Sequence, residues 1–222
     1  MLKTEDNERL TRVGPGNPMG VLLRRYWHPA LLSSEIPERD GPPVRVRLLG
    51  EDLIAFRDTQ DRIGMIDAYC AHRRAPLFYG RNEECGIRCV YHGWKFDVEG
   101  NCVDLPSLPA DSPVKAKVHI KSYPAIDKAG VIWVYMGPAD QEPPLPDYEW
   151  MRALPTHRHV AKNYRRAITS KPWKAGWIRH IPRFCITTFW ALDATPFETR
   201  TLLLRSKFIR PSMATNTCRC ES

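Results

Sequence analysis

Two short segments of the sequence carry the residue types that bind metal ions. Cys70-Ala71-His72 is followed, after the sixteen residues 73–88, by Cys89-Val90-Tyr91-His92. Each segment therefore supplies one thiolate and one imidazole, which are ligands for zinc and for iron. Each also lies at the end of a run of strand-forming residues, 64–68 and 87–90. Two such loops placed side by side could enclose a binuclear metal centre.

The spacing within the two pairs bears on the kind of centre. Zinc sites usually leave about two to four residues between paired ligands of one type. Here each pair is mixed, and the first has a single residue between its members. A Rieske [2Fe–2S] centre takes two Cys on one iron and two His on the other, which suits one Cys–His pair on each of two loops. A zinc-binding interaction module remains the alternative at this point.

The residues beside His92 suit a loop around a cluster. Gly93 allows the backbone to come close to the inorganic sulfides, and Trp94 can cover the loop with apolar area. Tyr91, directly before His92, offers a hydroxyl that can donate a hydrogen bond to a cluster sulfide or to a Cys sulfur, which would raise the reduction potential of the cluster.

The motifs CAHRRAPLFYG and CVYHGWKFD closely resemble the Rieske signature, and the Gly-Trp after the second His resembles its oxygenase branch. The segment RRYWHPA at 24–30 is similar to the N-terminal segment of Rieske non-haem iron ring-hydroxylating oxygenase α-subunits, especially the group around phthalate 4,5-dioxygenase. The resemblance covers about residues 5–163. It implies that Cys70 and Cys89 bind one iron and that His72 and His92 bind the other.

The same resemblance implies an activity and partners. In the family, a flavin- or ferredoxin-type reductase reduces the cluster, which passes the electron to a mononuclear Fe(II). That iron uses O₂ to hydroxylate, dihydroxylate or demethylate an aromatic or related substrate. The subunits of the family form a homotrimer. The alternative function is a stand-alone Rieske-type electron-transfer protein.

The remaining Cys and His residues of the N-terminal part predict no second site. Cys85 and Cys102 lie outside the ligand pattern and are expected to be buried or free thiols. For the histidines we expect packing at His28, an edge or surface position at His119, and surface positions on a strand at His157 and His159.

The elements that must position the two loops are mostly short strands. A short helix over 4–12 and further helical turns over 19–27 predict an N-terminal arm, residues 1–35. Alternating residues at 44–48, with a turn and the apolar segment 53–56, predict a hairpin, and short β-rich runs predict further strands at 63–66, 87–91, 95–98, 118–123 and 131–136. The expected fold is mainly β, with a Rieske domain of antiparallel sheets over 36–140. A Pro-rich linker and the start of a catalytic domain follow over 141–163.

Length and composition exclude several classes of protein. The chain has 222 residues, of which 43% are hydrophobic and 26% charged, which excludes a disordered, collagen-like or coiled-coil chain. The sequence has no apolar run of membrane-spanning length and no secretory signal at its N-terminus. We therefore expect a cytoplasmic protein without a membrane partner, whose seven Cys are ligands or free thiols.

The net charge of +8 is confined to the end of the chain. Residues 1–163 carry 22 Lys or Arg and 22 Asp or Glu, whereas residues 164–222 carry 11 and 3. The body of the chain is therefore neutral, and we expect no nucleic-acid partner.

The resemblance stops where the charge changes. A catalytic domain of the family supplies two His and one carboxylate to its iron, usually in the motif Asp-x-x-His-x-x-x-x-His. Residues 164–222 contain one histidine, His180, and no Asp-x-x-His. They end near an isolated Cys218-Arg219-Cys220.

Another reading frame, in which each triplet begins at the third base of a codon, gives a different result. In that frame, the codons allowed for residues 172–186 permit Leu-Glu-Gly-Gly-x-Asp-x-x-His-x-x-x-Leu-His. The junction of Trp173 with Lys174 forces the Glu, and that of Trp177 with Ile178 forces the Asp. We infer that the sequence from about Arg165 onward is out of frame, by a genuine frameshift or a sequencing error. Residues 164–222 are then expected to be a disordered tail. We expect neither a mononuclear Fe(II) site nor oxygenation by the chain as given.

Overall fold

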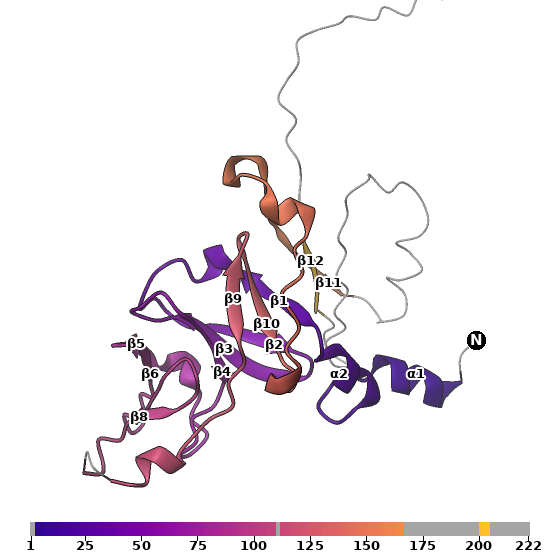
Figure 1. Ribbon diagram of the computed structural model, residues 1–222. Coiled ribbons are helices and arrows are strands. Elements are labelled where there is room, and N and C mark those ends of the chain that lie inside the picture. The colour runs from indigo at the N-terminus through magenta and orange to yellow at the C-terminus, as the bar shows by residue number, and fades with distance from the viewer. Residues whose placement is uncertain (1–2, 110–111, 167–199, 205–222) are drawn as a thin grey trace, which may run out of the picture.

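The computed structural model describes residues 3–109, 112–166 and 200–204. Figure 1 shows two short helices at one side of a body of short antiparallel strands. The mainly β fold predicted from the sequence is confirmed. Among the described residues, neither helix is long and apolar enough to cross a membrane.

The N-terminal arm consists of helix α1 (Thr4–Thr11) and helix α2 (Pro18–Leu23). Acidic residues in the first turn of α1 favour its start, and Pro18 occupies the first helical position of α2, where it sacrifices no hydrogen bond. The predicted helical turns over 19–27 are partly wrong, because α2 ends at Leu23 and Trp27 begins a strand.

Within the described residues, the strands form four antiparallel sheets. The first has the order β1-β10-β9, the second β2-β3-β4, the third β5-β6-β7-β8, and the fourth pairs β11 with β12. Their bounds are β1 Trp27–Leu32, β2 Val44–Leu48, β3 Glu51–Arg57, β4 Ile63–Asp67, β5 Arg81–Glu83, β6 Gly86–Arg88, β7 Lys95–Phe96, β8 Cys102–Asp104, β9 Ala125–Lys128, β10 Val131–Tyr135, β11 Lys162–Arg166 and β12 Arg200–Leu204.

Most of the predicted strands are present, and one is wrong. The β2–β3 hairpin pairs Val44 with Ala55 and Leu48 with Glu51, around a turn at Leu49-Gly50 in which both φ angles are positive. The segment 118–123 makes only isolated bridges, at His119 and Ser122. Its backbone instead reaches two different neighbours, since Ile120 N–H donates to Gly100 and Tyr123 N–H to Met65.

Strand β3 lies between the two main cores, and both of its faces are buried. Leu53 and Ala55 pack into a core between the first two sheets, whereas Ile54 and Phe56 pack into a second core beneath the third sheet. Alternate side chains of a strand point to opposite faces. One strand therefore connects the two halves of the body, and the second core, which includes Cys70 and Cys89, is where the candidate site lies.

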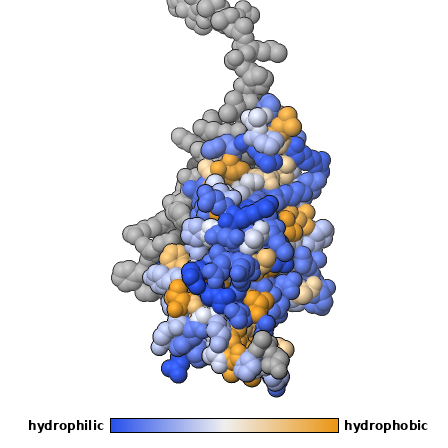
Figure 2. Space-filling view, turned by 90° about the vertical axis from the view of Figure 1, so that its left-hand side faces the viewer, coloured by the Kyte–Doolittle hydropathy of each residue, from blue (hydrophilic) through white to orange (hydrophobic). Residues whose placement is uncertain are grey.

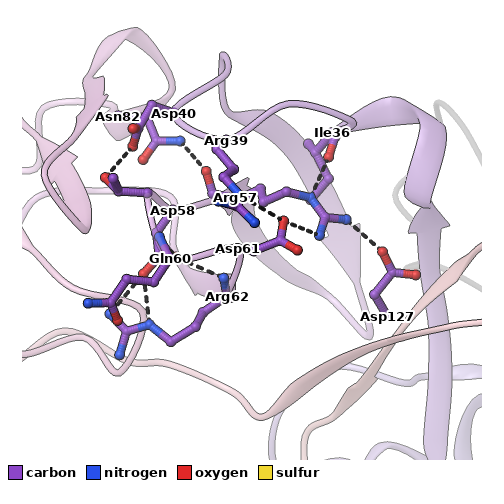
Figure 3. A network of polar contacts seen from close by, with 11 residues as sticks. Ile36, Arg39, Asp40, Arg57, Asp58, Gln60, Asp61, Arg62, Asn82 and Asp127 are labelled. Carbon is purple, nitrogen blue, oxygen red and sulfur yellow. Dashed lines mark hydrogen bonds and ion pairs between the residues drawn. The ribbon is translucent and has the colours of Figure 1, made fainter.

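A polar network fastens the turn between β3 and β4 to its neighbours (Figure 3). The Arg57 guanidinium donates to Asp127 of β9 at 2.6 Å, to Asp61 at 3.0 Å and to the Ile36 carbonyl at 3.0 Å. Asp58, which is fully buried, accepts hydrogen bonds from two backbone N–H groups and from the side chain of Arg62. These bonds hold β9 against the β3–β4 turn.

A second polar cluster attaches the N-terminal arm. Arg24 donates to the carbonyls of Val13, Gly20 and Leu49 and to the carboxylate of Glu51 at 2.8 Å. Lys121 and Tyr123 donate to the other oxygen of the same carboxylate at 2.7 and 2.8 Å. Glu51 therefore joins the arm, the β2–β3 turn and the segment before β9.

The surface seen from the side of the third sheet is mostly hydrophilic, with separate hydrophobic patches (Figure 2). The large apolar side chains exposed in the described residues come from several segments, among them Tyr79, Val90, Tyr91 and Leu108. Isolated apolar side chains of this kind are ordinary on a protein surface.

The segment after residue 163 is described in part. Residues 162–166 pair with 200–204 as β11 and β12. His180, Cys218 and Cys220 lie outside the described residues, as does most of the segment 164–222 for which we expect disorder.

Candidate metal centre

The two Cys–His segments begin where two strands of different sheets end. Strand β4 ends at Asp67, and its chain reaches Cys70 through a bridge between Tyr69 and Pro76. Strand β6 ends at Arg88, directly before Cys89. The sequence-based placement of both segments after strands is therefore confirmed.

Both loops have the same pattern of backbone hydrogen bonds. In the first loop, the Cys70 N–H donates to Ala75 at 2.9 Å, and its carbonyl accepts from Arg74 at 3.0 Å. In the second, the Cys89 N–H donates to Trp94 at 2.8 Å, and its carbonyl accepts from Gly93 at 3.0 Å. In each loop, the residue five positions after the Cys accepts its N–H, and the residue four positions after it donates to its carbonyl.

The shared pattern has a shared conformation at the fourth position. Arg74 has φ 56° and Gly93 has φ 74°, which is the left-handed region that favours glycine. A Cβ on Gly93 would also lie 3.0 Å from Cγ of Pro106. The turn favours glycine at position 93, and the close Pro106 side chain adds a second reason that does not apply to Arg74 and that the sequence alone did not supply.

The folded chain brings the four candidate ligands together in two pairs. The thiols of Cys70 and Cys89 interact with each other and are buried, with 1% and 3% exposure. The imidazole rings of His72 and His92 have centroids 4.5 Å apart, and both residues are exposed. The thiols thus face the protein interior, and the imidazoles lie at its surface.

The protonation of Cys70 reflects this burial. Burial raises the pKa of the Cys70 thiol to about 11, and the neighbouring Cys89 adds to the effect, while the backbone N–H groups of His72 and Arg73 oppose it. A bound metal ion deprotonates a coordinating thiol outright. Two adjacent buried thiols with backbone N–H groups directed at one of them fit a thiolate pair on one metal ion.

The pairing bears on the choice between zinc and a cluster. A structural zinc ion takes four protein ligands at one point. Within the described residues, no three His, Cys, Asp or Glu side chains converge on a single metal position. A Rieske centre has two Cys ligands on one iron and two His ligands on the other, and the grouping of the donors into a thiol pair and an imidazole pair fits that arrangement.

The residues expected around the ligands lie against the two imidazoles. The Trp94 ring stacks on His72 with a centroid distance of 4.5 Å and an interplanar angle of 6°. The rings of Tyr91 and His92 have centroids 3.9 Å apart, and Tyr91 is 59% exposed. Nε1 of Trp94 is buried and makes no hydrogen bond within the described residues.

Arg88 is a site residue that the sequence analysis missed. It donates to the carbonyl of Gly93 at 2.8 Å and to the carboxylates of Asp104 at 2.7 Å and Glu83 at 2.6 Å. The guanidinium holds the pKa of both carboxyl groups below their usual range. It thereby fixes the second loop to β5 and β8. In the sequence, its position directly before the ligand candidate Cys89 was the feature that could have identified it.

The other Cys and His residues have the roles expected of them, with one correction. His28 is fully buried, its Nε2 lies 2.7 Å from the Leu23 carbonyl, and burial lowers its pKa to about 3. Cys85 and Cys102 are free thiols, and three of the histidines are exposed. Neither His157 nor His159 lies on the expected strand. His157 is in a 3₁₀ turn (Pro155–His157), because Pro155 begins that turn, and His159 lies between this turn and β11. Among the histidines outside the two ligand pairs, the exposed ones are His119, His157 and His159.

Comparison with known proteins assigns the middle of the chain to a family. Residues 26–124 match the model of the Rieske [2Fe-2S] domain. This range contains both loops, the whole of the second and third sheets, and strand β1 of the first sheet.

Curated relatives extend the similarity. The chain is 47% identical over 173 residues to the phthalate 4,5-dioxygenase oxygenase subunit of Pseudomonas putida, covering 78% of this chain and 38% of the relative. It is 53% identical over 149 residues to the 3-chlorobenzoate-3,4-dioxygenase oxygenase subunit of Comamonas testosteroni, covering 67% of this chain and 34% of the relative. The chain thus spans little more than a third of these relatives.

Solved structures give the same result. Pseudomonas putida CBB5 NdmA matches with a TM-score of 0.59 at 25% identity, over 70% of this chain and 48% of that one. Dicamba monooxygenase with non-heme iron and dicamba matches with a TM-score of 0.57 at 26% identity, over 65% of this chain and 43% of that one.

Proposed function

Since the chain contains a Rieske [2Fe–2S] domain, in residues 26–124, and is related to oxygenase subunits, we propose that it transfers single electrons in an oxygenase reaction. In this proposal, Cys70 and Cys89 bind one iron of the cluster, and His72 and His92 bind the other. The observation that carries the proposal is the grouping of the four side chains into a buried thiol pair and an exposed imidazole pair.

When bound, the cluster supplies a one-electron carrier whose His ligands place its potential above that of four-Cys plant-type ferredoxins. The residues of the chain control access to it. The buried Cys side chains lie in the apolar second core, whereas the exposed His72 and His92 form the edge that a partner can approach. We propose that electrons enter and leave through this imidazole edge.

We further propose that the electron donor is a flavin- or ferredoxin-type reductase, and that the intact protein is a homotrimer that carries a mononuclear Fe(II). The names of the relatives indicate dioxygenation of aromatic acids and, for the 5,5'-dehydrodivanillate relative of Sphingobium sp., O-demethylation. We therefore expect O₂-dependent hydroxylation or demethylation of an aromatic substrate by the intact protein.

The chain as given has no Asp-x-x-His motif after residue 163, and its codons permit that motif in another frame. For this reason we propose that the given chain carries the cluster but does not perform the oxygenation. Sequencing the gene across codons 155–190 tests this. An extra or missing base near codon 165 would make the product a full-length oxygenase subunit. If the frame is confirmed, the purified chain should show no hydroxylated product, and detection of one would overturn the proposal.

The cluster assignment is tested by reconstitution of the purified full chain with iron and sulfide under anaerobic conditions. The wild type should show the visible absorption of a [2Fe–2S] cluster and, after reduction, its electron paramagnetic resonance (EPR) signal. Cys89→Ser should lose most of both signals. Cys85→Ser is the matched control, because Cys85 is a free thiol outside both ligand pairs, and it should keep them. Equal iron content in the two variants, or a colourless wild type that binds zinc, would reject the assignment.

A further inference from the structure

A buried N–H group beside the candidate cluster site lacks an acceptor. Nε1 of Trp94 is buried and makes no hydrogen bond within the described residues. Two other tryptophans satisfy theirs, since Trp27 donates to the Pro143 carbonyl at 2.7 Å and Trp133 to the Lys128 carbonyl at 3.3 Å. A buried indole N–H normally finds a partner, so the exception at Trp94 needs an explanation.

Trp94 contacts both cluster loops. Its ring stacks on the imidazole of His72 from the first loop, and its carbonyl accepts the N–H of Cys89 in the second. It also packs against the apolar core that includes Cys70 and Cys89. The unpaired N–H thus belongs to a side chain held at the boundary between the thiol pair and the imidazole pair.

A buried donor without a protein acceptor is often completed by a group that binds there. The group that this site fits carries two inorganic sulfides and two thiolates, all of which accept hydrogen bonds. We propose that the Trp94 N–H donates a hydrogen bond to a sulfur atom of the cluster or of its thiolate ligands. This inference rests on the cluster assignment made above.

The expected consequence is an effect on the reduction potential. A hydrogen bond to sulfur stabilises the reduced cluster, which is the more negative state, and so raises the potential. The stacking on His72 is a separate contact that depends on the face of the ring. A phenylalanine at position 94 keeps an aromatic face and removes the donor.

The test is a redox titration of the full chain and its Trp94→Phe variant, each with the same cluster content. We expect the equilibrium constant for reduction to fall about 3- to 10-fold, as for the loss of one hydrogen bond, and a tenfold change corresponds to about 59 mV for one electron. Trp133→Phe is the matched control, because its N–H has a backbone acceptor in another core, and its potential should match the wild type. An unchanged potential in Trp94→Phe would overturn the inference.

A measurement on the wild type covers the case in which Trp94→Phe does not retain the cluster. Tryptophan labelled with ¹⁵N in the indole should give a hyperfine coupling to the reduced cluster in pulsed EPR. Trp133→Phe should keep this coupling. Absence of an indole coupling in a sample with full cluster content would reject the hydrogen bond. Failure of the wild type to bind a cluster would instead reject the cluster assignment itself.

Discussion

Replacing Glu51 by Gln should destabilise the domain, because one buried carboxylate joins three separate segments. Its side chain is 11% exposed, and it accepts from Arg24 at 2.8 Å, Lys121 at 2.7 Å and Tyr123 at 2.8 Å. The Gln side chain has nearly the same shape but carries no charge, and its amide N–H₂ must face one of these donors. The change therefore tests the charge and the hydrogen bonds with little change in packing.

The magnitude depends on which partners are left without an acceptor. A hydrogen bond to a charged group contributes about 1.5–3 kcal/mol, and the Arg24 side chain is only 12% exposed. Arg24 keeps its three carbonyl acceptors, which limits the loss. Lys121 is 53% exposed and can turn to water, so it adds little. We expect Glu51→Gln to lower the free energy of unfolding by about 2–3 kcal/mol at pH 7.

The deficit should depend on pH. Although burial alone raises the pKa of Glu51, the hydrogen bonds from Lys121, Arg24 and Tyr123 outweigh it, and the pKa is lowered. The folded state therefore favours the ionised form, and its stabilisation is present at neutral pH and lost as the pH falls below about 4.5. The difference between wild type and variant should shrink in that range.

Urea unfolding of samples with the same cluster content, at pH 7 and pH 4, measures both effects. The control is Asp52→Asn in the next residue, whose ion pair with Arg47 spans 3.5 Å between side chains that are 47–48% exposed. We expect it to cost less than about 0.5 kcal/mol. Equal losses in the two variants, or a Glu51→Gln deficit that does not change with pH, would refute the reasoning.

Three further predictions concern the cluster loops and the buried histidine. Gly93→Ala should lower the free energy of unfolding by about 1–3 kcal/mol and reduce cluster content, because the positive φ and the nearby Pro106 oppose a Cβ. Urea unfolding and iron analysis would measure this, and full stability with full iron content would contradict it. Arg74→Gly at the equivalent position should change stability by less than about 1 kcal/mol, because relief of its positive φ offsets the loss of its exposed contacts with Asp67 and Tyr69; a larger loss in the same assay would show that the two positions are not equivalent. Burial lowers the pKa of His28 to about 3, so as the pH falls from 7 to 5 the unfolded state binds a proton on this side chain and the folded state does not. Over that range, the free energy of unfolding of the wild type should therefore fall by about 2 kcal/mol more than that of His28→Gln. Parallel pH profiles of the two proteins would contradict this.

The sequence was sufficient for the fold class and for the positions of the two Cys–His loops. Alternating residues located β2, which has one buried face, and short apolar runs located β3, β4 and β10, whose side chains are mostly buried. The Cys–His spacing located both loops, since its residue types are rare outside metal sites.

The missed elements are those whose stability comes from distant partners. Strands β5 and β8 have three residues each, which is too short for an alternation to be visible. β9 is largely exposed and depends on its pairing with β10. Residues 118–123 have the composition of a strand, but their hydrogen bonds go to two different segments. Arg88 acquires its importance only through its hydrogen bonds to Glu83 of β5, Asp104 of β8 and the Gly93 carbonyl, which form when the second loop closes.

The attachment of the N-terminal arm has a consequence for folding kinetics. Arg24 needs the carbonyl of Leu49 and the carboxylate of Glu51, and these acceptors are in place only after the β2–β3 turn has formed. Tyr123, 72 residues from Glu51 in the chain, must also have arrived. The arm is therefore expected to dock after the main folding barrier, where contacts act on the unfolding rate rather than on the folding rate. In that case the arm determines how long the folded domain persists, while the strands behind it determine how quickly it forms.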